Sequence, residues 1–219
     1  MVYCRRRKVW TRWEQKGFRD SGGALCTPAN LWKMTKIMGI IALKSVLRPP
    51  EKPLEIVGND GWELVEQRVG ARLPEDYKAF IECYGTGRIG AFLVVLNPFS
   101  TNRFINLIDR SRVELEGLIA LRQKWPQYYL HDVFPSPAGL LPFASTDNGE
   151  ILYWRTACDP EQWTVVVYES RGPKHYDFDG RMTDFLAALL TRAIQCDVLP
   201  RTFPSGVVSF VPGMSGELM

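Results

Sequence analysis

A short glycine-rich segment has the spacing of a known chemical motif. Residues 85–90 are Gly-Thr-Gly-Arg-Ile-Gly, the pattern of a dinucleotide-binding loop. Such a loop follows a strand and opens a helix, so that backbone amides and the helix dipole face the pyrophosphate. Here the hydrophobic pattern predicts a helix before the glycines and a strand after them. This reversed order favours a helix end and a turn into a strand over a nucleotide site.

The two histidines are the other candidates for chemistry. His131 and His175 lie far apart in the sequence, and no cysteine or carboxylate stands at zinc-ligand spacing from them. His175, Asp177 and Asp179 could form a metal or acid–base cluster. An exposed turn, in which Asp179 caps the next helix, explains these residues more simply. We therefore expect no catalytic residue, no metal site and no cofactor.

The elements that must position these residues follow from hydrophobic periodicity. Helices are expected near residues 60–69, 74–84, 111–124 and 182–193. Strands are expected near residues 91–96, 141–145, 151–157 and 164–169, with further short strands at 174–178 and 206–211. This order predicts a single α+β domain, in which helices pack around a mainly antiparallel, twisted sheet.

The charges divide the chain near residue 50. Residues 1–50 hold eleven basic and two acidic residues, a net charge of +9, whereas residues 51–219 hold sixteen and twenty-two, a net charge of −6. Prolines within residues 48–53 indicate a linker. We therefore expect a basic, poorly patterned arm and linker over residues 1–50, a folded domain over 51–197 and a tail over 198–219.

The basic arm permits two interpretations. Four basic residues at positions 5–8 stand beside Trp10 and Trp13, a mixture typical of segments that contact nucleic acid or a membrane surface. Alternatively, translation begins at Met34 or Met38, and residues 1–37 are not part of the native protein. Nucleic-acid binding is expected only in the first case.

A series of short motifs follows in order along residues 58–195. They lie at residues 62–70, 73–77 (Leu-Pro-Glu-Asp-Tyr), 84–85, 92–98, 141–143, 149–154, 163–167, 176–180 and 185–186. This series resembles the SMI1/KNR4 family, also called the SUKH superfamily. The resemblance implies an α+β domain without shared catalytic residues. Bacterial members are mostly immunity proteins that bind and neutralise toxins, whereas fungal relatives regulate cell-wall synthesis and signalling.

The hairpin around Asn148 and Gly149 and its neighbours form the expected partner-binding surface. An Asn-Gly pair between apolar runs favours a tight hairpin turn. Carboxylates there would speed the encounter with a basic partner such as a nuclease, and aromatic side chains would anchor it. The candidate residues are Asp147, Glu150, Trp154, Asp159, Glu161, Trp163, Tyr176, Asp177 and Asp179. The alternative is that the carboxylates are ordinary solvated charges and the tryptophans belong to the core.

The resemblance and the chain's own features lead to one functional interpretation. Five widely spaced cysteines and the lack of a signal-peptide pattern favour a cytoplasmic protein. We expect an immunity protein that binds a cognate polymorphic or contact-dependent toxin, without a small-molecule substrate and without membrane association. The alternative is an intracellular scaffold or regulator of the same fold, which binds a signalling partner.

Overall fold

The compact part of the chain begins before the predicted linker. The computed structural model describes residues 39–58 and 60–213, so the basic arm and the possible starts at Met34 and Met38 lie outside the described residues. Residues 39–46 are helical, and the compact unit begins at Gly39. Leu43 and Leu47 are fully buried. The boundary predicted near residue 50 is therefore wrong, because the proline-rich segment connects two parts of one core.

Four α-helices follow, close to the positions that periodicity predicts. They are α2 (Asp60–Val69), α3 (Glu75–Tyr84), α4 (Leu107–Lys124) and α5 (Met182–Leu190), with a 3₁₀ turn η1 (Pro160–Gln162). Helix α4 begins four residues before its predicted start. Its N-cap Asn106 explains the difference, because the side-chain oxygen accepts from the backbone N–H groups of Ile108 and Asp109.

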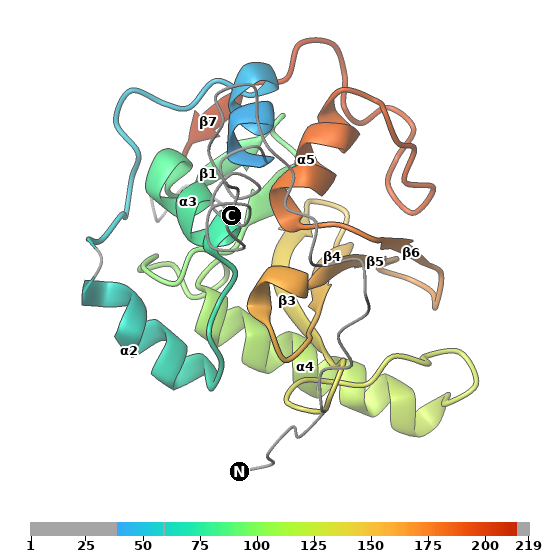
Figure 1. The fold of residues 1–219 in the computed structure, drawn as a ribbon. Coiled ribbons are helices and arrows are strands. Elements are labelled where there is room, and N and C mark those ends of the chain that lie inside the picture. Colours follow the sequence, from blue (N-terminus) through green and yellow to red (C-terminus); the bar gives the residue numbers. More distant parts are fainter. Residues whose placement is uncertain (1–38, 59, 214–219) are drawn as a thin grey trace, which may run out of the picture. The chain divides into compact units, whose positions relative to one another are not determined.

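Seven strands form one antiparallel sheet. They are β1 (Gly87–Ile89), β2 (Leu93–Val95), β3 (Leu140–Thr146), β4 (Ile151–Arg155), β5 (Thr164–Tyr168), β6 (His175–Phe178) and β7 (Phe210–Pro212). Their order is β6-β5-β4-β3-β2-β1-β7. The chain thus has the predicted α+β fold (Figure 1). Strand β7 pairs with β1, and Val198, Leu199 and Phe210 are buried, so the predicted separate tail after residue 197 is wrong.

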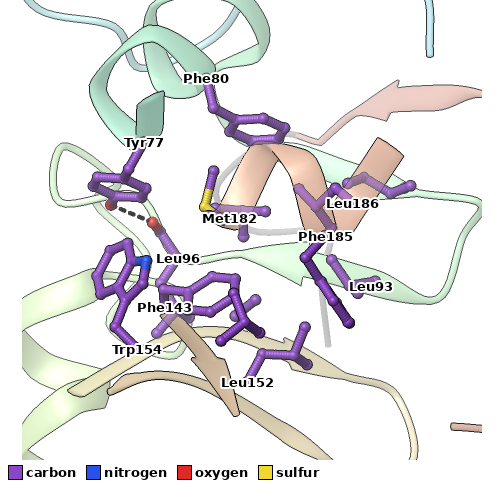
Figure 2. Packing of buried hydrophobic residues seen from close by; sticks show 14 of the residues in the cluster. Tyr77, Phe80, Leu93, Leu96, Phe143, Leu152, Trp154, Met182, Phe185 and Leu186 are labelled. Atoms are coloured by element: carbon purple, nitrogen blue, oxygen red, sulfur yellow. Dashed lines mark hydrogen bonds between the residues drawn. The ribbon is translucent and has the colours of Figure 1, made fainter. Parts of the chain in front are cut away.

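The larger core lies between one face of the sheet and helices α3 and α5 (Figure 2). Trp154 of β4 lies between Tyr77 of α3 and Phe143 of β3, with ring centroids 4.9 Å apart in both pairs. The Tyr77 hydroxyl donates to the Leu96 carbonyl oxygen at 2.6 Å. Phe185 of α5 is also fully buried in this core. The aromatic side chains of this face therefore have structural partners.

Helix α4 covers part of the opposite face. Leu118 of α4 belongs to a second buried cluster with Ile151 and Tyr153 of β4 and with Tyr168 of β5. Alternation along β4 produces this division, because successive side chains point to opposite faces of a sheet. This opposite face includes Tyr168 and Val166 of β5 and continues to the edge strand β6, where His175 and Asp177 pair with these two residues. Among the described residues, no helix is long and apolar enough to cross a membrane.

Candidate partner-binding surface

The predicted acidic residues lie at opposite ends of the sheet. Asp147 lies in the turn between β3 and β4, whereas Asp159 and Glu161 lie in the connection between β4 and β5. The five residues of β4 separate these two ends, and an extended strand of that length spans about 17 Å. These carboxylates therefore form two separate groups, and a partner-binding surface around the hairpin stays a prediction.

The two carboxylates of the hairpin already have partners. Asp147 is exposed, and its two oxygens lie 2.7 and 2.6 Å from Nη1 of Arg88. Glu150 is only 6% exposed, and its carboxylate accepts a hydrogen bond from the Thr146 hydroxyl. The backbone N–H of Glu150 donates to the same hydroxyl at 3.1 Å. Glu150 therefore stabilises the turn through Thr146. Its side chain is buried, so its predicted place on the surface is wrong.

The carboxylates of the β4–β5 connection cap helices. Asp159 is exposed and accepts from the backbone N–H of Glu161 at the start of η1, at 3.1 Å. The Glu161 carboxylate accepts from the backbone N–H of Glu75, at the start of α3, at 2.9 Å. Burial raises the pKa of Glu161, although the Glu75 hydrogen bond opposes this rise. Glu161 thus contributes to the packing of α3 against the sheet.

The predicted aromatic anchors are mostly core residues. Trp154 and Trp163 are 1% and 3% exposed. The indole N–H of Trp163 donates to the Ala157 carbonyl oxygen at 2.9 Å. Tyr176 is partly buried and packs against the same core. Both tryptophans are buried in the larger core, so the alternative of a core role is correct for both.

The fold brings Asp177 together with both histidines. Asp177 Oδ1 lies 3.5 Å from Nε2 of His131, and its Oδ2 lies 3.4 Å from Nε2 of His175. Nη1 of Arg155 also lies 3.5 Å from Oδ1. Asp179 is exposed and separate from this group. It is not the cap of α5 either, because the N-cap position there is Arg181.

Tyr168 holds His131 in this cluster. Its hydroxyl lies 2.8 Å from Nδ1 of His131, and its ring stacks on Tyr129 at 5.9 Å between centroids. Burial is the main cause that lowers the pKa of His131, and His175 and Arg155 act in the same direction, whereas Asp177 raises it. The ring is therefore mostly neutral at pH 7.

A loop rich in exposed aromatic residues adjoins the cluster. We name residues 125–132, which connect α4 with the segment before β3, the aromatic loop. Trp125, Tyr128 and Leu130 are 38%, 55% and 69% exposed. Arg122 of α4 holds the loop, because its Nε donates to the Tyr129 carbonyl oxygen at 3.2 Å. The partner hypothesis overlooked this loop, although Trp, Tyr, Tyr and Leu within six residues after a predicted helix were the signal.

Comparison with known proteins identifies the family. A family model described as SUKH_6, SMI1-KNR4 cell-wall, matches residues 59–186, more than half of the chain. Searches of curated proteins and of solved structures found no match. The matched range contains α2 to α4, strands β1 to β6 and the beginning of α5, and therefore both the aromatic loop and the Asp177 cluster. The chain belongs to the SUKH family of SMI1-KNR4 proteins.

Proposed function

We propose that this protein is an immunity protein, which binds and neutralises a cognate polymorphic or contact-dependent toxin in the cytoplasm of the producing cell. Membership of the SUKH family supports this proposal, because the family includes immunity proteins. Immunity of this kind requires a surface that recognises one protein and holds it tightly. The aromatic loop has the composition that such a surface needs.

The observation that carries the proposal is the exposure of Trp125, Tyr128 and Leu130 on one short loop. Large aromatic side chains dominate the energetics of protein interfaces, because each buries much apolar area with little loss of conformational freedom. Lys124 Nζ lies 4.3 Å above the Trp125 ring, so a cation already covers one aromatic face. Asp177 and the histidines beside the loop supply the polar groups that fix the orientation of a partner.

The charge of the domain supports a basic partner. The compact unit, Gly39–Met219, holds eighteen basic and twenty-two acidic residues, a net charge of −4. A negative field increases the rate at which a positively charged protein arrives, and this effect weakens as the salt concentration rises. Toxins that cleave nucleic acid need a positive cleft for the phosphate backbone. We therefore propose a basic toxin, such as a nuclease, as the partner.

Co-expression with the toxin encoded by the adjacent gene tests this function. Wild-type protein should co-purify with that toxin and protect the cell from it. The substitutions Trp125→Ala and Tyr128→Ala should each weaken binding at least tenfold, since interface aromatic residues contribute about 2 kcal/mol or more. Leu64→Ala and Val207→Ala are matched controls, because these side chains are also exposed, 52% and 99%, and lie outside the loop.

Two outcomes would contradict the proposal in different ways. If the wild-type protein neither binds the adjacent toxin nor protects the cell, the immunity function is wrong. If it does both and the loop variants behave like the two controls, the function stands and the binding surface is elsewhere. Surface plasmon resonance for affinity and a growth assay for protection separate these cases.

A second function has one observation in its favour. The matching family model carries the words "cell-wall" in its description, which fits an intracellular scaffold or regulator that binds a signalling partner. A gene without a toxin neighbour, together with capture of a host protein that Tyr128→Ala abolishes, would favour this alternative. A toxin gene next door and protection from its product would favour immunity.

A further inference from the structure

The Asp177 cluster has the composition and the spacing of a metal site. One ring nitrogen each of His131 and His175 and a carboxylate oxygen of Asp177 all lie within 4.8 Å of one another. They come from two parts of the chain, the end of the aromatic loop and the edge strand β6. Two imidazoles and one carboxylate form a common ligand set for zinc and other divalent transition metals.

The distances fit shared ligation better than direct hydrogen bonds. Nitrogen–oxygen hydrogen bonds in proteins are usually 2.7–3.2 Å long, whereas the two Nε2–oxygen distances to Asp177 are 3.5 and 3.4 Å. A tetrahedral zinc ion binds nitrogen and oxygen at about 2.0–2.1 Å, which places neighbouring ligand atoms about 3.3–3.4 Å apart. Each observed distance is therefore close to the separation of two atoms that bind one small cation, and the two distances involve the two different oxygens of Asp177.

The outer nitrogens of both rings are engaged in the way that ligation requires. Nδ1 of His175 lies 3.3 Å from the carbonyl oxygen of Pro173, which can only accept, so this nitrogen carries the proton. With the proton on Nδ1, the lone pair of Nε2 faces the Asp177 carboxylate. Nδ1 of His131 can likewise donate to the Tyr168 hydroxyl at 2.8 Å. A cation between the three groups satisfies both lone pairs and the carboxylate charge.

We propose that His131, His175 and Asp177 bind a divalent transition-metal ion, preferably Zn²⁺, through two Nε2 atoms and one carboxylate oxygen. Three protein ligands leave one position of a tetrahedral ion open. The site is accessible from solvent, because the Asp177 side chain is 42% exposed. The ion would also join the aromatic loop to β6, so it would stabilise the surface that contains them. Ion binding here does not depend on whether the partner is a toxin.

Arg155 competes with the ion for Asp177, so removal of its charge should change the zinc affinity in a predictable direction. Its Nη1 lies 3.5 Å from Asp177 Oδ1, and its side chain is 43% exposed. The guanidinium competes for the carboxylate and repels a second cation. Because the side chain is long and solvent-exposed, it can turn away when the ion binds. Arg155→Gln should therefore tighten metal binding, whereas a simple ion-pair network predicts no gain in affinity for zinc.

Titration of the tag-free full chain, stripped of metal with a chelator, tests the site. Zn²⁺ binding is measured by calorimetry, and Co²⁺ gives a visible absorption band when it is tetrahedral. We expect saturable binding at one ion per chain that His175→Gln and Asp177→Asn each weaken at least tenfold. Tyr168→Phe should weaken binding about tenfold, because loss of an outer-shell partner typically costs 10–100-fold. Mg²⁺ should not compete, since it prefers oxygen ligands.

Asp179→Asn is the matched control, because Asp179 is an exposed carboxylate two residues from Asp177 and outside the cluster. It should bind zinc as the wild type does. His175 and Asp177 lie on an edge strand, and circular dichroism will show that their variants are folded. If folded Asp177→Asn and His175→Gln bind Zn²⁺ as tightly as the wild type, or if the wild type shows no saturable binding, the site does not exist.

Discussion

The carboxylate of Asp76, in the first turn of α3, accepts two hydrogen bonds from Thr183, in the first turn of α5. Its Oδ2 lies 2.9 Å from the backbone nitrogen and 3.0 Å from the hydroxyl oxygen of Thr183. Both residues are fully buried. Asp76 thus places a negative group at the N-terminus of α5, where backbone N–H groups lack partners within the helix and the dipole is positive. The contact ties together the two helices that cover one face of the sheet.

Removal of the Asp76 carboxylate should destabilise the fold. Asp76→Ala leaves the N–H and hydroxyl of Thr183 buried without an acceptor, and we expect the free energy of unfolding to fall by about 2–3 kcal/mol. Asp76→Asn keeps one acceptor oxygen and should cost less, about 1 kcal/mol. Urea unfolding followed by tryptophan fluorescence measures both. Equal losses for the two variants would show that the hydrogen bonds to Thr183 do not carry the effect.

The pH dependence of stability should report the same buried carboxyl group. Burial raises the pKa of Asp76 above its ordinary value of 3.8, against the opposing hydrogen bonds from Thr183. The folded state therefore binds the proton more tightly than the unfolded state, so the stabilisation is fully present below pH 3.8 and is lost as the pH rises through the folded pKa.

Comparison with Asp76→Asn isolates this effect from other titrating groups. The unfolding free energy of the wild type, relative to that of the variant, should fall as the pH rises above 3.8, because the amide of the variant does not titrate. Urea titrations at several pH values across this range measure the difference. A difference that stays constant, or that grows as the pH rises, would contradict a raised pKa for Asp76.

Hydrophobic periodicity predicted the elements whose buried residues recur regularly along the sequence. Tyr77, Phe80, Ile81 and Tyr84 recur at helical spacing and are all buried in α3. Strand β1, by contrast, was not predicted, because it has only three residues and begins with a glycine. Three side chains are too few to show an alternation.

Contacts between distant segments explain the other differences. Asp76 caps a helix 107 residues away, and Glu161 caps one 86 residues away, whereas the sequence argument sought the cap of α5 in nearby Asp179. Likewise, His131 meets Asp177 because the loop before β3 lies against Tyr168 of β5, and β5 pairs with β6, which carries Asp177. Ligand spacing along the chain could not predict that meeting.

The core role of Trp154 predicts a large effect on stability. Trp154→Ala leaves a cavity between α3 and the sheet and should cost about 3–5 kcal/mol. Trp154→Phe should cost less, since the ring keeps part of the packing and the buried indole N–H has no partner among the described residues. Trp125→Ala is the surface control and should change the unfolding free energy by less than about 0.5 kcal/mol. Thermal and urea unfolding measure these costs. A cost for Trp125→Ala similar to that for Trp154→Ala would contradict the exposed position of Trp125.

Glu161 offers a way to separate a helix cap from a partner-binding charge. Glu161→Ala removes the acceptor for the Glu75 N–H at the start of α3, and we expect a loss of about 1 kcal/mol in unfolding free energy. Glu63→Ala is the control for loss of a carboxylate, because Glu63 is an exposed residue of α2, and it should have little effect. Affinity of the folded variants for the partner should be unchanged, because the Glu161 carboxylate accepts from α3, on the face of the sheet opposite to α4 and the aromatic loop. Weaker partner binding by folded Glu161→Ala, without loss of stability, would instead restore the acidic connection between β4 and β5 as the binding surface.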